Sequence, residues 1–314
     1  MSFPEIAAIA GPTAVGKTAL SLALAERHPF EIVSVDSMQV YRRLDIGTAK
    51  PTPEERAQIP HHLIDVASPE EKYDLARYLR DASNAIDDIR LRGKMPLLVG
   101  GTGLYLKALM NGIFDVPSRN PAVREQLQQR MDEEGLPPLF AELAEVDPPT
   151  AQRLSPNDAI RIIRALEVFR CTGKPMSYWH GNPDAPHTPA HPICLVVLHM
   201  DREELNKRIE QRTRAMLQAG WVEEVRALLA EGLPPDLHCF KALGYRQIIQ
   251  FIQTPMDPEM LMQAIARETR QFAKRQMTWF RAMPVRRWID VKTMKDSEVL
   301  ELLEEIFLRQ SASW

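Results

Sequence analysis

The chain has 314 residues, of which 45% are hydrophobic and 26% are charged, and its formal net charge is −3. This composition excludes an intrinsically disordered chain and predicts a folded protein with room for a large core and a second lobe. No apolar run approaches the length of a membrane span and no basic segment precedes the short N-terminal one, so we expect a cytoplasmic protein that makes no membrane contact.

The N-terminal segment contains a phosphate-binding motif. An apolar run at residues 6–10 predicts a short strand, and the residues after position 18 favour a helix. The turn between them fits the P-loop pattern G-x-x-x-x-G-K-T, in which backbone amides and the helix dipole bind phosphate: Gly11, Pro12, Thr13, Ala14, Val15, Gly16, Lys17 and Thr18. Lys17 adds a positive charge, and the Thr18 hydroxyl is a candidate ligand for Mg²⁺. The alternative is a glycine turn that matches the pattern by chance.

Short β-branched runs alternate with helical patterns in the first third of the chain. We expect strands over residues 5–10, 31–35, 63–66 and 95–99, and a helix over residues 74–92. This alternation is typical of βαβ units, so it predicts an α/β fold whose core is a parallel sheet with helices on both faces. Ligands of such sheets collect at the carboxyl ends of the strands, which makes the loops after the strands the candidate site segments.

The loop after the second predicted strand carries a candidate catalytic base. Asp36 follows that strand directly, and the polar side chains of Ser37 and Gln39 come next. A carboxylate at a strand end beside a P-loop is well placed to accept a proton from a bound substrate. The same aspartate could instead cap a short helix over residues 38–42, because Asp favours the N-cap position, and both roles could coexist.

The loop after the strand over residues 95–99 contains glycines and Thr102 but no acidic residue. Kinases and NTPases with a P-loop need a second acid at a strand end to organise Mg²⁺, so its absence from this loop disfavours those classes. Thr102 could contribute to the site, or it could cap a helix over residues 104–111.

From about residue 120 the periodicity is that of helices alone, which predicts an all-helical lobe inserted into the α/β core. Strand patterns resume at residues 193–198 and 288–291. The expected segments are a first part of the P-loop core over residues 1–113, the helical lobe over residues 114–190, and the second part of the core, with basic C-terminal helices, over residues 191–314.

A helix expected near the C-terminus concentrates positive charge. Residues 267–287 contain seven Arg or Lys residues and one acid, a local balance of +6 in a chain of net charge −3. At 100° per residue, a sector of about 60° holds Arg267, Arg270, Lys274 and Arg281. The opposite side holds Ile265, Phe272 and Phe280. A solvated charged face usually mixes both signs, so this one favours binding to a phosphate backbone, with Gln276 and Trp279 as polar and aromatic groups able to touch RNA.

The cysteines and histidines do not form a metal-binding pattern. Cys171, Cys194 and Cys239 stand far apart in the sequence, which excludes a cysteine-based zinc site and makes a disulfide framework improbable. We expect all three to be small buried side chains. His61 and His62 have no metal-ligand partners at suitable spacing, so we expect them to be solvated or packed.

Five motifs occur in order along the chain: the P-loop at residues 11–18, Asp-Ser-Met-Gln-Val-Tyr-Arg at 36–42, Gly-Gly-Thr-Gly-Leu-Tyr at 100–105, Lys-Ala-Leu-Gly-Tyr at 241–245 and Lys-Arg-Gln-Met-Thr-Trp-Phe at 274–280. Together they resemble the bacterial tRNA dimethylallyltransferase family, and the likeness covers nearly the whole chain. The resemblance implies transfer of a dimethylallyl group from dimethylallyl diphosphate to N6 of the adenosine immediately 3′ of a tRNA anticodon, with Mg²⁺ as the cofactor.

The resemblance also implies roles for individual residues. The P-loop would hold the diphosphate, and Thr18 would be the metal ligand. The implied catalytic set is Lys17, Thr18, Asp36 and Thr102, in which Asp36 would take the N6 proton and Thr102 would contact the tRNA near the reaction centre. The implied partners are dimethylallyl diphosphate and the anticodon stem-loop of tRNA, and we expect a monomer. The residues implied to line the tRNA, in part from the helical lobe, are Asp36, Ser37, Met38, Gln39, Thr102, Arg124, Ile160, Arg161, Ile162, Ile163, Arg164, Phe240, Lys241, Ala242, Leu243, Gly244, Tyr245, Lys274, Arg275, Gln276, Met277, Thr278, Trp279, Phe280 and Arg281.

Three other classes of function fit part of the pattern. A P-loop kinase or NTPase would consume ATP, but the missing second acid counts against it. An adenylate prenyltransferase would act on the free nucleotide and would not need the helical insertion or the basic helix. An RNA-binding regulator without catalytic activity would not explain a complete P-loop beside a carboxylate at a strand end.

Overall fold

The structure is a computed structural model that describes residues 5–113, 120–181, 190–254 and 256–308. The chain forms two compact units, one made of Met1–Asn111 with Ala190–Trp314 and the other of Gly112–Pro189. The boundary that the sequence predicts at residue 114 lies outside the described residues. Among the described helices, none combines the length and apolar content that a membrane crossing requires.

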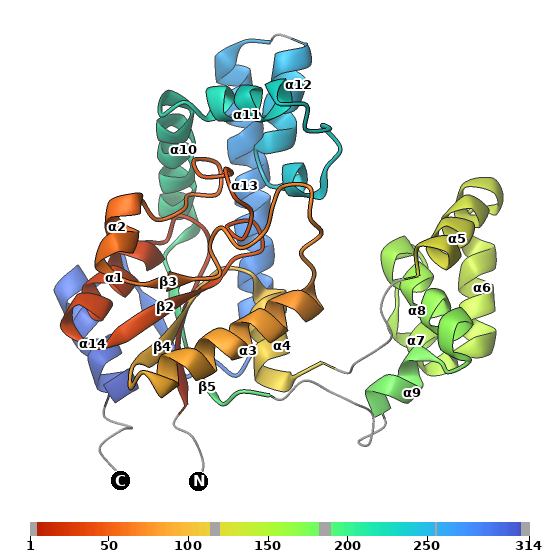
Figure 1. Cartoon of the computed structure of the whole chain (residues 1–314), viewed down its shortest axis with the longest axis horizontal. Helices are drawn as coiled ribbons and strands as arrows, with labels where there is room; N and C mark the ends of the chain where they lie inside the picture. Colours follow the sequence, from red (N-terminus) through yellow and green to blue (C-terminus); the bar gives the residue numbers. More distant parts are fainter. Residues whose placement is uncertain (1–4, 114–119, 182–189, 255, 309–314) are drawn as a thin grey trace. The chain divides into compact units, whose positions relative to one another are not determined.

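The first unit contains a six-stranded sheet in which every described pair of neighbouring strands is parallel. Its strands are β1 (Ile6–Ala10), β2 (Phe30–Val35), β3 (His61–His62), β4 (Met95–Gly100), β5 (Ile193–His199) and β6 (Arg287–Asp290). They lie in the order β3-β2-β4-β1-β5-β6. Strand β1 pairs with β4 on one side and with β5 on the other, so the two core segments form one sheet (Figure 1). The predicted α/β fold with a parallel sheet is confirmed.

The third strand differs from the prediction. The sequence favours a strand over residues 63–66, but β3 consists of His61–His62. Leu63 and Asp65 have φ angles of 63° and 58°, which lie in the left-handed region and cannot continue a strand. The carboxylate of Asp65 contacts Lys50 Nζ at 2.6 Å and Arg56 at 2.5 Å. These ion pairs stabilise the turn. The prediction of a strand over residues 63–66 was wrong.

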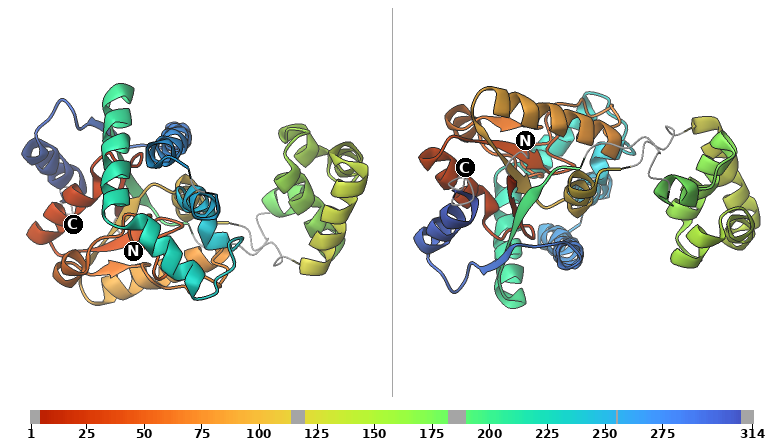
Figure 2. Two further views of the ribbon diagram at one scale, coloured as in Figure 1. Left: turned by 90° about the horizontal axis from the view of Figure 1, so that it is seen from above. Right: turned by 90° about the horizontal axis from the view of Figure 1, so that it is seen from below.

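Helices lie on both faces of the sheet. The helices of the first unit are α1 (Lys17–Arg27), α2 (Pro53–Gln58), α3 (Leu75–Leu91), α4 (Gly103–Asn111), α10 (Arg202–Gln218), α11 (Trp221–Ala230), η1 (His238–Lys241), α12 (Tyr245–Gln253), α13 (Pro258–Arg281) and α14 (Asp296–Leu308). Leu24 of α1, Ile209 of α10 and Leu303 of α14 pack in one buried cluster with Ile9 and Leu97 of the sheet. Figure 2 shows α3 on the opposite side of the sheet from α14. Complete burial of each such aliphatic side chain stabilises the fold by about 1.5–3 kcal/mol.

The second unit is entirely helical where it is described. Its helices are α5 (Pro121–Glu134), α6 (Leu136–Val146), α7 (Pro148–Arg153), α8 (Ala159–Thr172) and α9 (Met176–Gly181). Leu127, Leu139, Leu143 and Leu166 form the centre of its own hydrophobic core. An independent core is what allows an inserted segment to behave as a separate compact unit.

A buried carboxylate organises one side of this helical unit. Glu167 on α8 is fully buried, and its side chain contacts Arg124 at 3.3 Å and Arg164 at 3.1 Å. It also accepts a hydrogen bond of 2.9 Å from the backbone N–H of Asn120 at the start of α5. Two cations and one amide therefore compensate the cost of removing this charge from water.

The chain leaves and re-enters the first unit at one place. The backbone N–H of His191, before β5, donates to the carbonyl of Leu109 in α4 at 2.8 Å. The next residue, Pro192, accepts a 2.8 Å hydrogen bond from the N–H of Ile6 in β1. The return of the chain is therefore fixed to both α4 and the central strand of the sheet.

The cysteines follow the prediction only in part. Cys194 and Cys239 are buried in the first unit, whereas Cys171 is exposed. Cys171 lies in the last turn of α8, beyond the buried positions that end at Val168. The expectation that all three are buried was wrong for this residue.

Candidate active site

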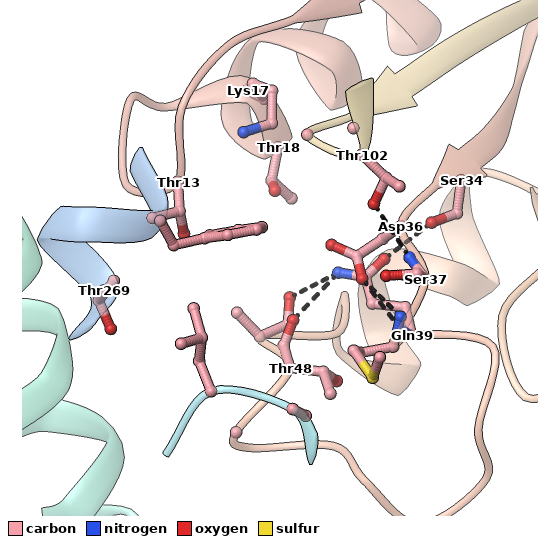
Figure 3. A pocket seen from close by; sticks show the side chains of 18 of the residues that line it. Thr13, Lys17, Thr18, Ser34, Asp36, Ser37, Gln39, Thr48, Thr102 and Thr269 are labelled. Atoms are coloured by element: carbon pink, nitrogen blue, oxygen red, sulfur yellow. Dashed lines mark hydrogen bonds between the residues drawn. The ribbon is translucent and has the colours of Figure 1, made fainter. Parts of the chain in front are cut away.

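A cavity of about 360 Å³ lies at the carboxyl edge of the sheet, among the loops that follow β1, β2 and β4. Its lining includes Lys17 and Thr18 of the P-loop, Asp36 after β2 and Thr102 after β4 (Figure 3). Helices α10 and α13 and the segment at residues 241–243 complete the walls. The four residues that the sequence assigns to the catalytic set therefore face one space.

The P-loop has the backbone that its motif requires. Gly16 has a φ angle of 104°, in the left-handed region that favours glycine, and it stands directly before the first residue of α1. Lys17 Nζ donates to the carbonyls of Gly11 at 3.0 Å and Pro12 at 2.9 Å. The ammonium group is thus held over the turn, beside the amino end of a helix, where an anion would bind.

Two cations create the electrostatic character of this end of the cavity. Burial and the neighbouring charge of Arg212 lower the pKa of Lys17 to about 7, although Asp36 acts in the opposite direction. The guanidinium of Arg212, from α10, donates to the hydroxyl of Thr13. Cations removed from water and close to each other are stabilised by an anion between them, so the site favours a phosphate group. The sequence reasoning did not identify Arg212.

The carboxylate of Asp36 has one oxygen in the backbone turn that follows it. Its Oδ1 accepts from the N–H groups of Met38 at 2.8 Å and Gln39 at 3.3 Å. Residues 37–40 form this turn, and the short helix considered over residues 38–42 is not present. Because Oδ1 fixes the turn, the carboxyl group is held in place while it faces the cavity (Figure 3).

Gln39 extends the same arrangement to residues 48 and 49. Its side-chain amide donates to the carbonyls of Thr48 and Ala49, both at 3.2 Å, and accepts from the hydroxyl of Ser34 at 2.9 Å. The hydroxyl of Thr102 accepts from the backbone N–H of Ser37. Hydrogen bonds between separate loops therefore hold the polar wall of the cavity, which is the preorganisation that a catalytic group requires.

Another part of the lining is apolar. Met216 of α10, Trp221 of α11 and Leu243 contribute to it, together with Ile265 and Phe272 of α13. A cavity with cations and backbone amides at one end and hydrocarbon side chains elsewhere suits a ligand with a charged head and an apolar tail. This dual character was not part of the prediction from the sequence.

The donor set fits Mg²⁺ rather than a metal that needs several side-chain ligands. In the part of the chain that the structure describes, no cluster of three His, Cys, Asp or Glu residues could hold a metal ion. The Thr18 hydroxyl and the Asp36 carboxylate both line the cavity, and Mg²⁺ typically takes one or two protein oxygens and completes its shell with phosphate oxygens and water. His62 contacts Glu31 at 2.7 Å and His61 contacts the carbonyl of Ile59 at 2.7 Å, so both half-buried histidines have partners within the protein.

Helix α13 is amphipathic, with one difference from the prediction. Lys274 and Arg281 are exposed, and Ile265 and Phe280 are buried on the other side of the helix. Phe272 is half-buried, and its ring lines the cavity instead of packing fully against the sheet. The helix therefore presents cations to solvent and part of its apolar side to the site.

Several residues implied to contact tRNA have side chains inside the protein. Ile160, Arg161, Lys241, Lys274, Arg275, Thr278 and Arg281 are exposed. The buried ones are Ile162, Ile163, Phe240, Ala242, Tyr245, Gln276 and Phe280. In α8 and α13 the difference arises because a continuous range of helical residues includes both the solvent face and the core face. The buried side chains therefore support the fold of the segments that carry the exposed ones.

Gln276 is the clearest correction within this set. The sequence reasoning placed it on the RNA-binding surface, but only 5% of the residue is exposed. Its side chain contacts the P-loop at Thr13 and the loop after β4 at Gly101. Gln276 is therefore a component of the cavity wall.

Comparisons with known proteins agree on one kind of enzyme. A family model described as IPP transferase matches residues 39–283, and one described as isopentenyl transferase matches residues 4–65. A protein of Trichlorobacter lovleyi named tRNA dimethylallyltransferase 1 is 48% identical over 289 residues, which are 91% of this chain and 93% of that protein. The solved tRNA isopentenylpyrophosphate transferase of Bacillus halodurans is 34% identical, with a TM-score of 0.69 over 99% of each chain. A structure described as a eukaryotic dimethylallyltransferase acting on tRNA is 28% identical, with a TM-score of 0.80 over 99% of this chain and 78% of that one.

Proposed function

The chain belongs to the IPP transferase family, and we propose that it transfers a dimethylallyl group from dimethylallyl diphosphate to N6 of the adenosine immediately 3′ of the anticodon in tRNA. Its relatives are named tRNA dimethylallyltransferase, and the eukaryotic protein of similar fold is described as acting on tRNA. The observation that carries the proposal is that the P-loop and the carboxylate of Asp36 face the same cavity. The P-loop can hold a diphosphate while the carboxylate of Asp36 accepts a proton.

The largest barrier in this reaction is the departure of diphosphate from the allylic carbon. Negative charge grows on the leaving group as the C1–O bond breaks, and the P-loop amides and Lys17 would stabilise it. Arg212, whose guanidinium contacts Thr13, adds a second cation at the same end. An anion in this position favours the protonated form of Lys17, because opposite charge raises a lowered lysine pKa.

Mg²⁺ is the proposed cofactor, and its chemistry when bound is to neutralise charge on the diphosphate. Thr18 would hold it through the hydroxyl, and the carboxylate of Asp36 lines the same cavity. The protein would also hold the diphosphate at the amino end of α1, so the leaving group is fixed relative to the rest of the cavity.

Asp36 would act on the nucleophile. The lone pair of the adenine N6 is delocalised into the ring, so the amine is a weak nucleophile until its proton begins to leave. In the proposed step the N6–C1 bond forms as the C1–O bond breaks, the N6 proton passes to the Asp36 carboxylate, and diphosphate departs with the bonding electron pair. The apolar lining that includes Phe272 and Leu243 would receive the dimethylallyl chain and exclude water from it.

The acceptor must bring a base into a cavity at the edge of the sheet. A base in the anticodon loop can reach it only when the base leaves its stack, and single-stranded loops allow this at modest cost. The exposed Lys274 and Arg281 of α13 would bind the phosphate backbone and compensate that cost.

The direct test supplies labelled dimethylallyl diphosphate, Mg²⁺ and unmodified tRNA to the purified chain, followed by nucleoside analysis. We expect the label in N6-isopentenyladenosine from the anticodon loop. Parallel reactions with AMP as acceptor and with ATP alone separate the alternatives. Label in AMP but not in tRNA would indicate an adenylate prenyltransferase, and ATP hydrolysis without prenylation would indicate an NTPase.

A further inference from the structure

The side-chain amide of Gln276 joins three segments that are far apart in the sequence. Its Oε1 accepts a hydrogen bond of 2.9 Å from the backbone N–H of Thr13, the third residue of the P-loop. Its Nε2 donates a hydrogen bond of 2.9 Å to the carbonyl of Gly101, after β4. The residue is only 5% exposed, and its bond to Gly101 is buried while its bond to Thr13 is partly buried, so competition from water is reduced.

The loop after β4 has room for this amide only because residue 101 is a glycine. A Cβ at Gly101 would lie 2.1 Å from Nε2 of Gln276, which is too close. Apart from the Gln276 side chain, the first atom that this Cβ would meet is the carbonyl oxygen of Gly11, at an ordinary contact distance of 3.5 Å. A methyl group at this position would therefore displace the amide and little else. The backbone of residue 101 and the side chain of residue 276 are fitted to each other.

Thr13 is held from a second helix as well. Its hydroxyl accepts from Arg212 of α10, while its N–H donates to Gln276 of α13. Two residues earlier the backbone carbonyl of Gly11 accepts from Lys17. The position of Thr13 thus sets the path of the loop whose amides and lysine face the cavity.

We infer that Gln276 is a positioning residue that holds the P-loop in its diphosphate-binding form by tying Thr13 to the loop after β4. The inference rests on the proposed function of the P-loop as the diphosphate site. Gln276 acts through Thr13, because its side-chain oxygen and nitrogen both bond to the backbone of the protein. Exposed Lys274 and Arg275 precede it in the sequence, so the helix with the basic face also supports the donor site.

The test measures binding of inorganic diphosphate with Mg²⁺ to the full chain by calorimetry. Gln276→Met keeps a similar side-chain length but removes both hydrogen bonds, and we expect diphosphate affinity to fall about 10- to 100-fold. Affinity for unmodified tRNA should stay within about twofold, because the exposed cations of α13 are unchanged. Gln263→Met is the matched control, since Gln263 is exposed on the same helix, and it should bind diphosphate as the unmodified chain does.

The outcomes separate the two proposals. If the unmodified chain does not bind diphosphate, the proposed function of the P-loop fails. If it binds and Gln276→Met binds equally well, the positioning role of Gln276 is overturned while the proposed function stands.

Gly101→Ala provides an independent variant in case Gln276→Met does not fold. Its methyl group displaces the amide without removing it, so diphosphate affinity should fall in the same direction. The double variant should bind diphosphate no more weakly than the weaker-binding single variant, because both changes break the same hydrogen bonds. Additive losses would contradict a shared mechanism.

Binding of tRNA by the same variants gives a readout that general destabilisation would not produce. Loss of the fold would lower the affinities for tRNA and for diphosphate together, whereas loss of the hydrogen bond to Thr13 should lower only the affinity for diphosphate. Equal losses of both affinities would overturn the role.

Discussion

The hydroxyl of Thr102 accepts a hydrogen bond of 3.1 Å from the backbone N–H of Ser37. The two residues follow β4 and β2, which are neighbours in the sheet. Ser37 is the residue after Asp36, so this bond fixes the proposed base relative to the loop on the adjacent strand. A hydroxyl from one loop therefore positions a carboxylate in another.

Replacing Thr102 with valine should lower the rate of prenyl transfer about tenfold, because the half-buried N–H of Ser37 loses its acceptor and the Asp36 loop can move. Thr102→Ser keeps the hydroxyl and should restore most of the rate. The measurement is kcat at saturating donor and tRNA. Equal rates for the valine variant and the unmodified chain would contradict this role for the hydroxyl.

Asp36→Asn should reduce the single-turnover rate by about 10²- to 10⁴-fold, since the amide cannot accept the N6 proton. The Asn oxygen can still accept from Met38 and Gln39, so the turn and the affinity for tRNA should be preserved. Asp45→Asn, at an exposed carboxylate in the same segment, is the control and should be nearly neutral. Unchanged chemistry in Asp36→Asn would refute its role as the base.

Lys17 should make diphosphate binding depend on pH near neutrality. Burial and Arg212 lower its pKa from 10.5 to about 7, so the free protein holds a charged Lys17 below about pH 7 and a neutral one above it. Affinity for diphosphate should therefore fall as the pH rises through about 7. Lys17→Met removes the titrating group. Protonation of diphosphate itself affects both proteins equally, so it cancels in the difference between their binding free energies. This difference between the unmodified chain and Lys17→Met should shrink as the pH rises through about 7. A difference that does not change with pH would contradict the lowered pKa.

Lys274→Ala and Arg281→Ala should weaken tRNA binding and flatten its salt dependence. Each phosphate contact that is lost should reduce the slope of log K against log salt by about 0.7–0.9. Lys295→Ala, at an exposed cation outside α13, serves as the control. Binding titrations at several salt concentrations measure the slope, and an unchanged slope would reject this face as the RNA site.

Glu167→Ala should destabilise the helical unit by about 2–4 kcal/mol, because it removes the shared partner of two half-buried arginines and of a backbone amide. Hydrogen exchange at the amides of α5 and α8 in the full chain would report the loss locally. Glu145→Ala, at an exposed position on α6, should leave this exchange unchanged. Equal protection in both variants would show that the buried ion pairs contribute little.

The sequence located much of the candidate site because the relevant residues follow strands directly. In a parallel sheet the carboxyl ends of β1, β2 and β4 meet at one edge, so Lys17, Asp36 and Thr102 had to come together once the strands were identified. Their individual roles stay predictions. The strand after β2 was misplaced because Leu63 and Asp65 take left-handed φ angles, which apolar and β-branched patterning does not reveal.

Arg212 could not be found in the same way. Helix α10 carries many charges, and nothing in its sequence distinguishes Arg212 from the half-buried Arg208 or the exposed Arg214. Its contact with Thr13 depends on how α10 packs against the P-loop, which is a tertiary relationship. Local patterns do not contain that information.

Gln276 was misassigned although its helix does carry the information. The buried residues of α13 include Ile265, Thr269, Ala273 and Phe280, which follow one another at spacings of four, four and seven residues. Gln276 lies three residues after Ala273, on the same side of the helix. The periodicity therefore placed a polar residue on the packed side of the helix. A buried glutamine needs partners for its amide, and those partners are what the structure supplies.

The hydrogen bond between His191 and Leu109 has a consequence for how the chain can vary in length. The two ends of the helical insertion meet within one backbone contact, so a short connection of a few residues could close the catalytic sheet without altering its strand pairing. The helical insertion can thus be lost, enlarged or exchanged for another module through a single pair of junctions. Such a change would leave in place the residues that line the cavity at the strand ends.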